Sequence, residues 1–173
     1  MDLILKNVNP KDVVTRNFSG RKTEFTPEGR RSFKLRIAEE DALQMQADGW
    51  PIESWDAKDG NGNPTGEKRY ALRVHVRFDN FPPEIKMYTG GRVTVLGENE
   101  IGTLDYAEIE AVGMKIHGSR WTLSNGRTGI KAYLSQMNVK IKENELDEEF
   151  AKYLDADISN AFASDESDVP FDV

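Results

Sequence analysis

The sequence of 173 residues contains no cysteine, which excludes a disulfide framework, a thiolate zinc site and a cysteine nucleophile. Long apolar runs are also missing, since no stretch approaches the ~18 consecutive apolar residues of a membrane-spanning helix. Met1–Pro10 lacks the basic start, apolar run and cleavage site of a secretory signal. We therefore expect a soluble protein of the cytoplasm.

Side chains suited to catalysis are few. The two histidines, His75 and His117, stand in unrelated contexts, and no spacing suggests a Ser-His-Asp triad. The segment 59–63 superficially resembles a calcium loop, but Pro64 replaces the required glycine and Tyr70 the required glutamate. No glycine pattern that binds phosphate leads into a helix. The sequence therefore predicts no enzyme, no metal site and no cofactor.

Charge divides the chain into two parts. The whole sequence has 30 acidic and 23 basic residues, for a net charge of −7. Residues 143–173 hold 11 of the acidic residues and a single basic one, Lys152, so this stretch carries −10. Residues 1–142 keep 19 acidic and 22 basic residues, a net +3. A basic core followed by an acidic extension is compatible with binding to nucleic acid.

Two segments alternate clearly between apolar and polar residues. Arg31–Ile37 and Tyr70–Phe78 each place apolar side chains at every second position, the pattern of a half-buried strand. Their other faces carry mainly cations. Further strands are predicted at 1–8, 85–88, 92–96, 107–116 and 129–141, with a loop or hairpin over 9–29.

One short helix is predicted at 39–48, with Leu43 and Ala47 on one face and Gly49 at its end. The composition of 56–68 predicts an exposed loop. Many short strands, glycine-rich turns and a single helix indicate a mainly β fold, a closed or nearly closed barrel.

Cations on the polar sides of these strands combine with aromatic residues at strand ends and loops. Cations can follow a phosphate backbone, and aromatic faces can stack on unpaired bases without demanding a sequence. The alternative is that the charged residues only make the outer face of the fold hydrophilic and bind no nucleic acid. Trp121 stands beside Arg120 and close to Arg127, which predicts a groove edge there. The candidate nucleic-acid-binding residues are Lys34, Arg36, Trp50, Trp55, Arg73, His75, Arg77, Tyr88, Arg120, Trp121, Arg127, Lys131 and Tyr133.

The acidic extension has two predicted parts, an amphipathic helix or linker over 143–162 and a disordered tail over 163–173. The tail joins the apolar set Val169–Phe171 to carboxylates, which suits docking to a partner pocket with a basic rim. A purely solubilising tail is the alternative, and the tail could also compete weakly with DNA for the groove. The candidate partner-binding residues are Asp165, Glu166, Asp168, Val169, Pro170, Phe171 and Asp172.

Three parts of the chain resemble phage-encoded single-stranded DNA-binding proteins with an oligonucleotide/oligosaccharide-binding (OB) barrel. They are Phe33–Leu35 leading into a helix and Gly49–Trp50, then Tyr70–Phe78, then Gly129–Leu134. The resemblance covers most of 32–141. It implies an OB-fold-like barrel of about five or more antiparallel strands with one short helix.

The end of the chain is similar to the tip of bacterial single-stranded DNA-binding proteins, whose acidic tails end in Ile-Pro-Phe and recruit other proteins. Here the chain continues through Asp172 and Val173. In the bacterial family the phenylalanine is the last residue and its own carboxylate helps in docking. A partner specific to a phage therefore fits this ending at least as well as the host proteins that bind the bacterial tails.

The resemblance implies an OB-fold core over 1–142 that coats and protects single-stranded DNA (ssDNA) during phage replication or recombination. The tail would recruit a polymerase, primase, helicase or recombinase, and the protein would be a monomer or small homo-oligomer. Two alternatives remain open. One is a protein-interaction adaptor or inhibitor whose tail mimics DNA, and the other is RNA binding by the same groove.

Overall fold

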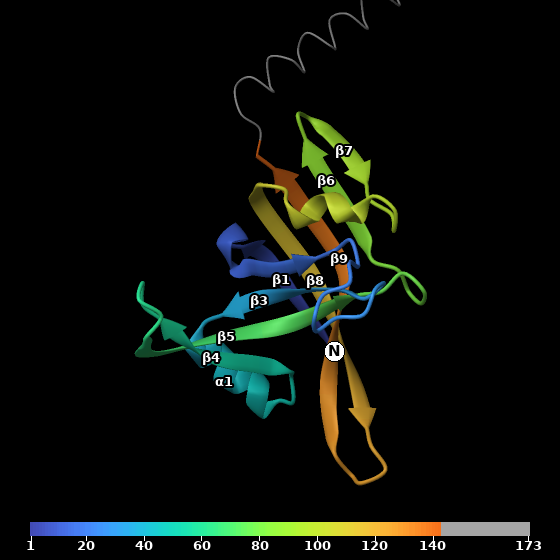
Figure 1. Cartoon of the computed structure of the whole chain (residues 1–173). Helices are drawn as coiled ribbons and strands as arrows, with labels where there is room; N and C mark the ends of the chain where they lie inside the picture. The colour runs from blue at the N-terminus through green and yellow to red at the C-terminus, as the bar shows by residue number, and fades with distance from the viewer. Residues whose placement is uncertain (143–173) are drawn as a thin grey trace, which may run out of the picture.

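The computed structural model describes residues 1–142, which form nine strands and one α-helix together with two short 3-10 helices (Figure 1). The predicted helix or linker over 143–162 and the predicted tail over 163–173 lie outside the described residues. The helices are α1 (Glu39–Ala47) and the 3-10 helices η1 (Pro10–Asp12) and η2 (Ile101–Asp105). The strands are β1 (Asp2–Val8), β2 (Val13–Asn17), β3 (Arg31–Ile37), β4 (Ile52–Lys58), β5 (Pro64–Val76), β6 (Glu84–Thr89), β7 (Arg92–Val95), β8 (Ile109–Thr122) and β9 (Thr128–Ile141).

The strands form one sheet in the order β1-β8-β9-β5-β3-β2. β4 pairs with β5, and β6 pairs with both β7 and β9. Two of the pairings, β5 with β9 and β6 with β9, are parallel, whereas the expected barrel was of antiparallel strands. The strands at the two ends of the order, β1 and β2, follow one another in the chain and are joined by η1.

Alternation along the strands places the core on one side. β3 buries Phe33 and Leu35, and β5 buries Leu72, Val74 and Val76 against them. On β9 every second residue is buried up to Leu134. The β8–β9 register then shifts, so the next buried residue is Met137 and the alternation continues from there. The side chains between these positions face outward, and they include most of the predicted cations.

Several sequence-based boundaries were wrong. The segment 56–68 is no loop, because β4 and β5 extend into it and satisfy each other's backbone in a hairpin. Only 59–63 turns, where the Asp59 carboxylate accepts hydrogen bonds from the backbone amides of Asn61 and Asn63. Along α1 the buried residue is Ala42, whereas Leu43 is 50% exposed. No helix in the described part has the length and apolar character to cross a membrane.

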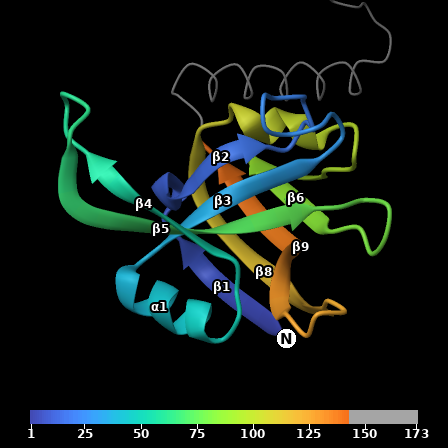
Figure 2. The same cartoon turned by 60° about the horizontal axis from the view of Figure 1, so that its bottom comes forward.

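Two hairpins extend away from the body of the molecule in Figure 1, one at the β4–β5 turn and one at the β8–β9 turn. Figure 2 shows α1 below β5 and to the left of β1. Trp50 follows α1 and packs against the base of the β8–β9 hairpin. A Cβ atom on Gly118 would lie 2.6 Å from the indole Cη2 of Trp50, so only glycine leaves room for this ring.

Candidate nucleic-acid interface

Cross-strand pairing brings the outward side chains of five strands onto one surface, here called the cationic face. Lys34 of β3 lies opposite Arg73 of β5, and Ser32 lies opposite His75. His75 is also the parallel partner of Tyr133 on β9, which lies opposite His117 on β8. The cationic face consists of Ser32, Lys34, Glu53, Trp55, Arg73, His75, Arg77, His117, Ser119, Trp121, Lys131 and Tyr133.

At one end of the cationic face, Glu53 of β4 bridges two cations. Its carboxylate oxygens lie 2.8 Å from Lys34 Nζ and 3.1 Å from Arg73 Nε. Burial raises the pKa of Glu53, but the hydrogen bonds from Lys34 and Arg73 outweigh burial and lower the pKa overall. Lys34 Nζ also lies 5.9 Å from the ring of Trp55, within cation–π range. Glu53 is thus a charged acceptor among groups that suit phosphate.

At the other end, the Tyr133 ring lies among cations. The Arg77 guanidinium is 5.8 Å and Lys131 Nζ 5.7 Å from its centroid, and the His75 ring is 6.1 Å away. Burial, together with the nearby charges of Lys131, Arg73, Arg30 and Arg77, lowers the pKa of His75 to about 4. His75 is therefore neutral at neutral pH.

A pocket of about 530 Å³ opens beside Tyr133. Arg77 lies at its edge and is held by Asp79 through two hydrogen bonds, Nε to Oδ1 at 3.0 Å and Nη2 to Oδ2 at 2.7 Å. Phe81 also lines the pocket and is 88% exposed, with a left-handed backbone at φ 53°. A large apolar ring held in solvent beside cations is available to stack on a base. The pocket is completed by Asn80, His117, Ser119, Leu134 and Ser135.

Trp121 extends the cationic face onto the β8–β9 hairpin. It lies opposite Gly129, and a Cβ atom there would come within 2.5 Å of the indole Cζ2. The ring therefore packs against Gly129 and stays 38% exposed. Ser119 and Lys131 form the next pair on the same side of the hairpin, so Trp121 and Tyr133 share one surface.

Five predicted residues are not among those that make up the cationic face. Trp50 is 5% exposed and packs in the core, so its assignment to nucleic-acid binding was wrong: it offers no face to a base. Arg120 alternates with Trp121 and lies on the opposite side of the hairpin. Arg127 is exposed in the hairpin turn, and Tyr88 lies on β6. Arg36 shares the outward side of β3 with Lys34 and lines a pocket with Lys68 and Tyr70 at the end of the cationic face.

Sequence reasoning missed Phe81, His117, Ser119 and Glu53. Phe81 had a usable signal, an aromatic residue in a turn-forming segment directly after a cationic strand. His117 and Ser119 join the face only through the β8–β9 register, which the sequence does not reveal.

The described residues contain no group of three or more His, Cys, Asp or Glu side chains that could hold a metal ion.

A protein-family model described as "Putative phage ssDNA-binding domain" matches residues 2–172. The chain belongs to this phage ssDNA-binding family. No curated protein matches it. This phage ssDNA-binding protein is mainly β with one short helix, as the family resemblance implied.

Solved structures of the single-stranded DNA-binding protein from bacteriophage Enc34 are similar to the chain. The structure in complex with ssDNA is 16% identical, with a TM-score of 0.48 over 83% of this chain and 88% of that chain. The C-terminally truncated form is 15% identical, with a TM-score of 0.46 over 83% and 87%. A third structure of the same protein is 14% identical, with a TM-score of 0.46 over 83% and 82%.

Proposed function

We propose that the cationic face holds the single strand, with cations on the phosphates and aromatic rings on the bases. The observation that carries this proposal is the surrounding of Tyr133, whose ring lies within 6.1 Å of His75, Arg77 and Lys131. A base that stacks on Tyr133 would bring its own phosphates within reach of both cations.

The cations of the face supply affinity that does not depend on sequence. Lys34, Arg73, Arg77 and Lys131 would contact about four phosphates, and each contact releases counterions. Their acidic partners, Glu53 and Asp79, lie on an exposed or half-exposed surface, where ion pairs contribute only ~0–1 kcal/mol. Phosphates can therefore take over these cations at small cost.

We further infer that the sheet closes on itself as an OB-type barrel. β1 pairs with β8 at one end of the strand order, and β2 pairs with β3 at the other. Because η1 links β1 directly to β2, these two strands would act as one bent strand that closes the sheet. Such a barrel supports an outer groove for a single strand. The cationic face crosses β3, β5, β9 and β8, which would be adjacent strands of that barrel.

The biological role that fits this surface is to coat and protect ssDNA during phage replication or recombination, without catalysis. Residues 163–173 would recruit a partner protein, such as a polymerase, primase, helicase or recombinase. Support comes from the sequence, which places Val169–Phe171 among carboxylates. Deleting Ser164–Val173 should leave the affinity for DNA equal or higher, because a negative segment repels phosphate, and should abolish partner capture. Capture by the truncated protein would place docking within residues 1–163.

Fluorescence anisotropy of a labelled oligo(dT) at several salt concentrations tests the central proposal. For about four phosphate contacts we expect log K to fall against log salt with a slope of about −3. Duplex DNA should not displace the oligonucleotide. Absence of binding at low salt would overturn the proposal and favour the adaptor, while equal displacement by matched RNA would favour an RNA-binding role.

The variant Arg73→Glu with Arg77→Glu should weaken binding while the core stays folded, because both side chains face outward. Lys11→Glu with Lys58→Glu is the matched control, since it makes the same change of charge outside the cationic face. Circular dichroism checks the fold of both. An equal loss of affinity in the two variants would mean that only net charge matters.

A further inference from the structure

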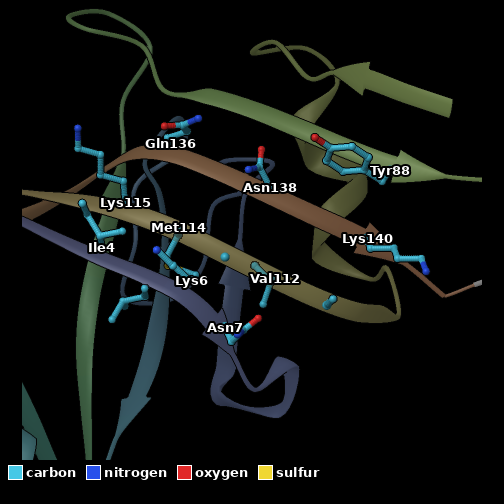
Figure 3. Close-up of a pocket in the computed structure, with 13 residues that line it drawn as sticks. Ile4, Lys6, Asn7, Tyr88, Val112, Met114, Lys115, Gln136, Asn138 and Lys140 are labelled. Atoms are coloured by element: carbon cyan, nitrogen blue, oxygen red, sulfur yellow. The ribbon is translucent and has the colours of Figure 1, made fainter. Parts of the chain in front are cut away.

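A second groove, of about 560 Å³, lies on the outer side of β1, β8, β9 and β6. Figure 3 shows that its side chains come from all four strands. Three lysines, three side-chain amides and one half-exposed aromatic ring line it. The residues used below are Lys6, Lys115, Lys140, Gln136, Asn138 and Tyr88.

Small residues on β8 make the floor of this groove. Gly113 lies opposite Asn138, and Ala111 lies opposite Lys140. A Cβ atom on Gly113 would lie 2.6 Å from the backbone oxygen of Lys6, so glycine is what allows β1 to approach here. The backbone thus forms the floor, and the longer side chains of the neighbouring positions form the walls.

The charge of the groove favours an anionic ligand. Lys115 pairs with Asp2 at 3.6 Å, and Lys140 pairs with Glu110 at 3.4 Å. Both pairs are exposed and therefore weak. Lys6 forms no ion pair with another residue in 1–142. A polyanion would replace the two weak acidic partners of Lys115 and Lys140. It would also pair with Lys6, which has no acidic partner within 1–142.

The groove also carries groups that suit unpaired bases. Tyr88 is 37% exposed and is the parallel partner of Lys140, so an aromatic face stands beside a cation, as at Tyr133. The exposed amides of Gln136 and Asn138 can each donate and accept hydrogen bonds at a base edge. An acidic peptide would use the lysines but would have no need of this combination.

The groove is continuous with the cationic face, because both lie on the outer sides of β8 and β9. The pair His117–Tyr133 belongs to the cationic face, and the next outward pair along the hairpin, Lys115–Gln136, belongs to the groove. From Tyr133 to Lys140 a strand rises ~23 Å at ~3.3 Å per residue. That length accommodates several nucleotides beyond the cationic face.

We propose that the groove is the second segment of one ssDNA track, entered by the strand after it leaves the cationic face. This proposal rests on the proposed function. It states that a short oligonucleotide occupies the cationic face alone, whereas a longer one also contacts Lys6, Tyr88 and Lys140.

The test compares oligo(dT) of about 6 and about 16 nucleotides, lengths within the site sizes known for one OB fold. In Lys6→Glu with Lys140→Glu, the long oligonucleotide should lose about tenfold or more in affinity, and its salt slope should shrink by about 1.4 for two lost phosphates. The short oligonucleotide should bind as it does to the unchanged protein. Lys11→Glu with Lys58→Glu is again the charge-matched control.

Three outcomes would overturn the inference: no change for either length, an equal loss for both, or a gain for both. A gain would mean that an acidic segment such as 143–173 occupies the groove instead. Failure of the proposed function is seen separately, as absent binding of the short oligonucleotide to the unchanged protein.

A second measurement is photocrosslinking of a long strand with 5-iododeoxyuridine at each position. We expect crosslinks to Tyr88 only from positions near one end of the oligonucleotide. The absence of any crosslink to Tyr88 would contradict the proposed track.

Discussion

Glu53 holds Lys34 in place, with its carboxylate 2.8 Å from the lysine Nζ, and the same carboxylate also binds Arg73. In the proposed binding mode, a phosphate would compete with this carboxylate for the two cations. Glu53→Gln removes the competing charge and keeps the side-chain shape. We expect affinity for oligo(dT) to rise by up to about fivefold, the equivalent of ~1 kcal/mol. Anisotropy titration measures the change.

The control for Glu53→Gln is Glu40→Gln on α1, which removes one negative charge from an exposed position outside the cationic face. That variant should bind as the unchanged protein does. Weaker binding by Glu53→Gln would contradict the prediction and would mean that the carboxylate orients Lys34 and Arg73 for DNA.

His75 gives the interface a defined pH response. Its pKa in the free protein is about 4, below the usual 6.5, because burial and the surrounding cations oppose the proton. Stability linked to His75 is therefore complete above about pH 6.5 and is lost as the pH falls toward 4. A phosphate nearby would stabilise the imidazolium and raise the pKa in the complex. Affinity should therefore increase as the pH falls through that raised pKa.

NMR titration of the His75 ring with and without oligo(dT) measures this shift. His117→Gln simplifies the spectrum, since the chain has two histidines. In His75→Gln the extra pH dependence of binding should disappear. An unchanged His75 pKa in the complex would mean that no phosphate comes near this ring.

The sequence predicted the central strands well because their alternation is strong. Arg31–Ile37 was predicted with the observed bounds, and the cations between its apolar residues do face outward. The outward side of a strand follows from period-two alternation alone. The groups that these cations meet depend on the register between strands, so the contact of Lys34 with Glu53 could not be predicted.

The tryptophans show the same limit. Trp50 and Trp55 stand near each other in sequence at the start of one predicted loop, and composition alone does not separate them. The structure buries Trp50 because Gly118, far along the chain, leaves a space for its ring. Trp55 stays exposed on β4 above Lys34. Burial that depends on a distant glycine is a tertiary effect without a local signal.

Trp121 and Trp50 should respond in opposite ways to removal. Trp121→Ala should remain folded and lose about five- to hundredfold in affinity, since stacking on a base contributes ~1–3 kcal/mol. Trp50→Ala leaves a cavity in the core and should lower the free energy of unfolding by ~3–5 kcal/mol. Urea denaturation and anisotropy together separate the two effects. A stable Trp50→Ala protein with weakened DNA binding would contradict the placement of Trp50 in the core.

Asp105 fastens the loop between β2 and β3 to η2. Its buried carboxylate accepts hydrogen bonds from the backbone amides of Phe18 and Ser19 and from Ser19 Oγ, and it pairs with Arg21 at 3.0 Å. Asp105→Ala would leave these donors without an acceptor. We expect the free energy of unfolding to fall by ~2–4 kcal/mol, measured by urea denaturation.

The loop that Asp105 holds leads into the cationic face, because Arg30 at its end acts on His75. Asp105→Ala should therefore also increase hydrogen exchange over 18–30 and weaken oligo(dT) binding under conditions where the protein stays folded. Glu108→Ala, an exposed acid close to Asp105 in sequence, is the control and should change neither property. A loss of less than ~0.5 kcal/mol for Asp105→Ala, within the range of ordinary surface substitutions, would mean that other contacts hold the loop.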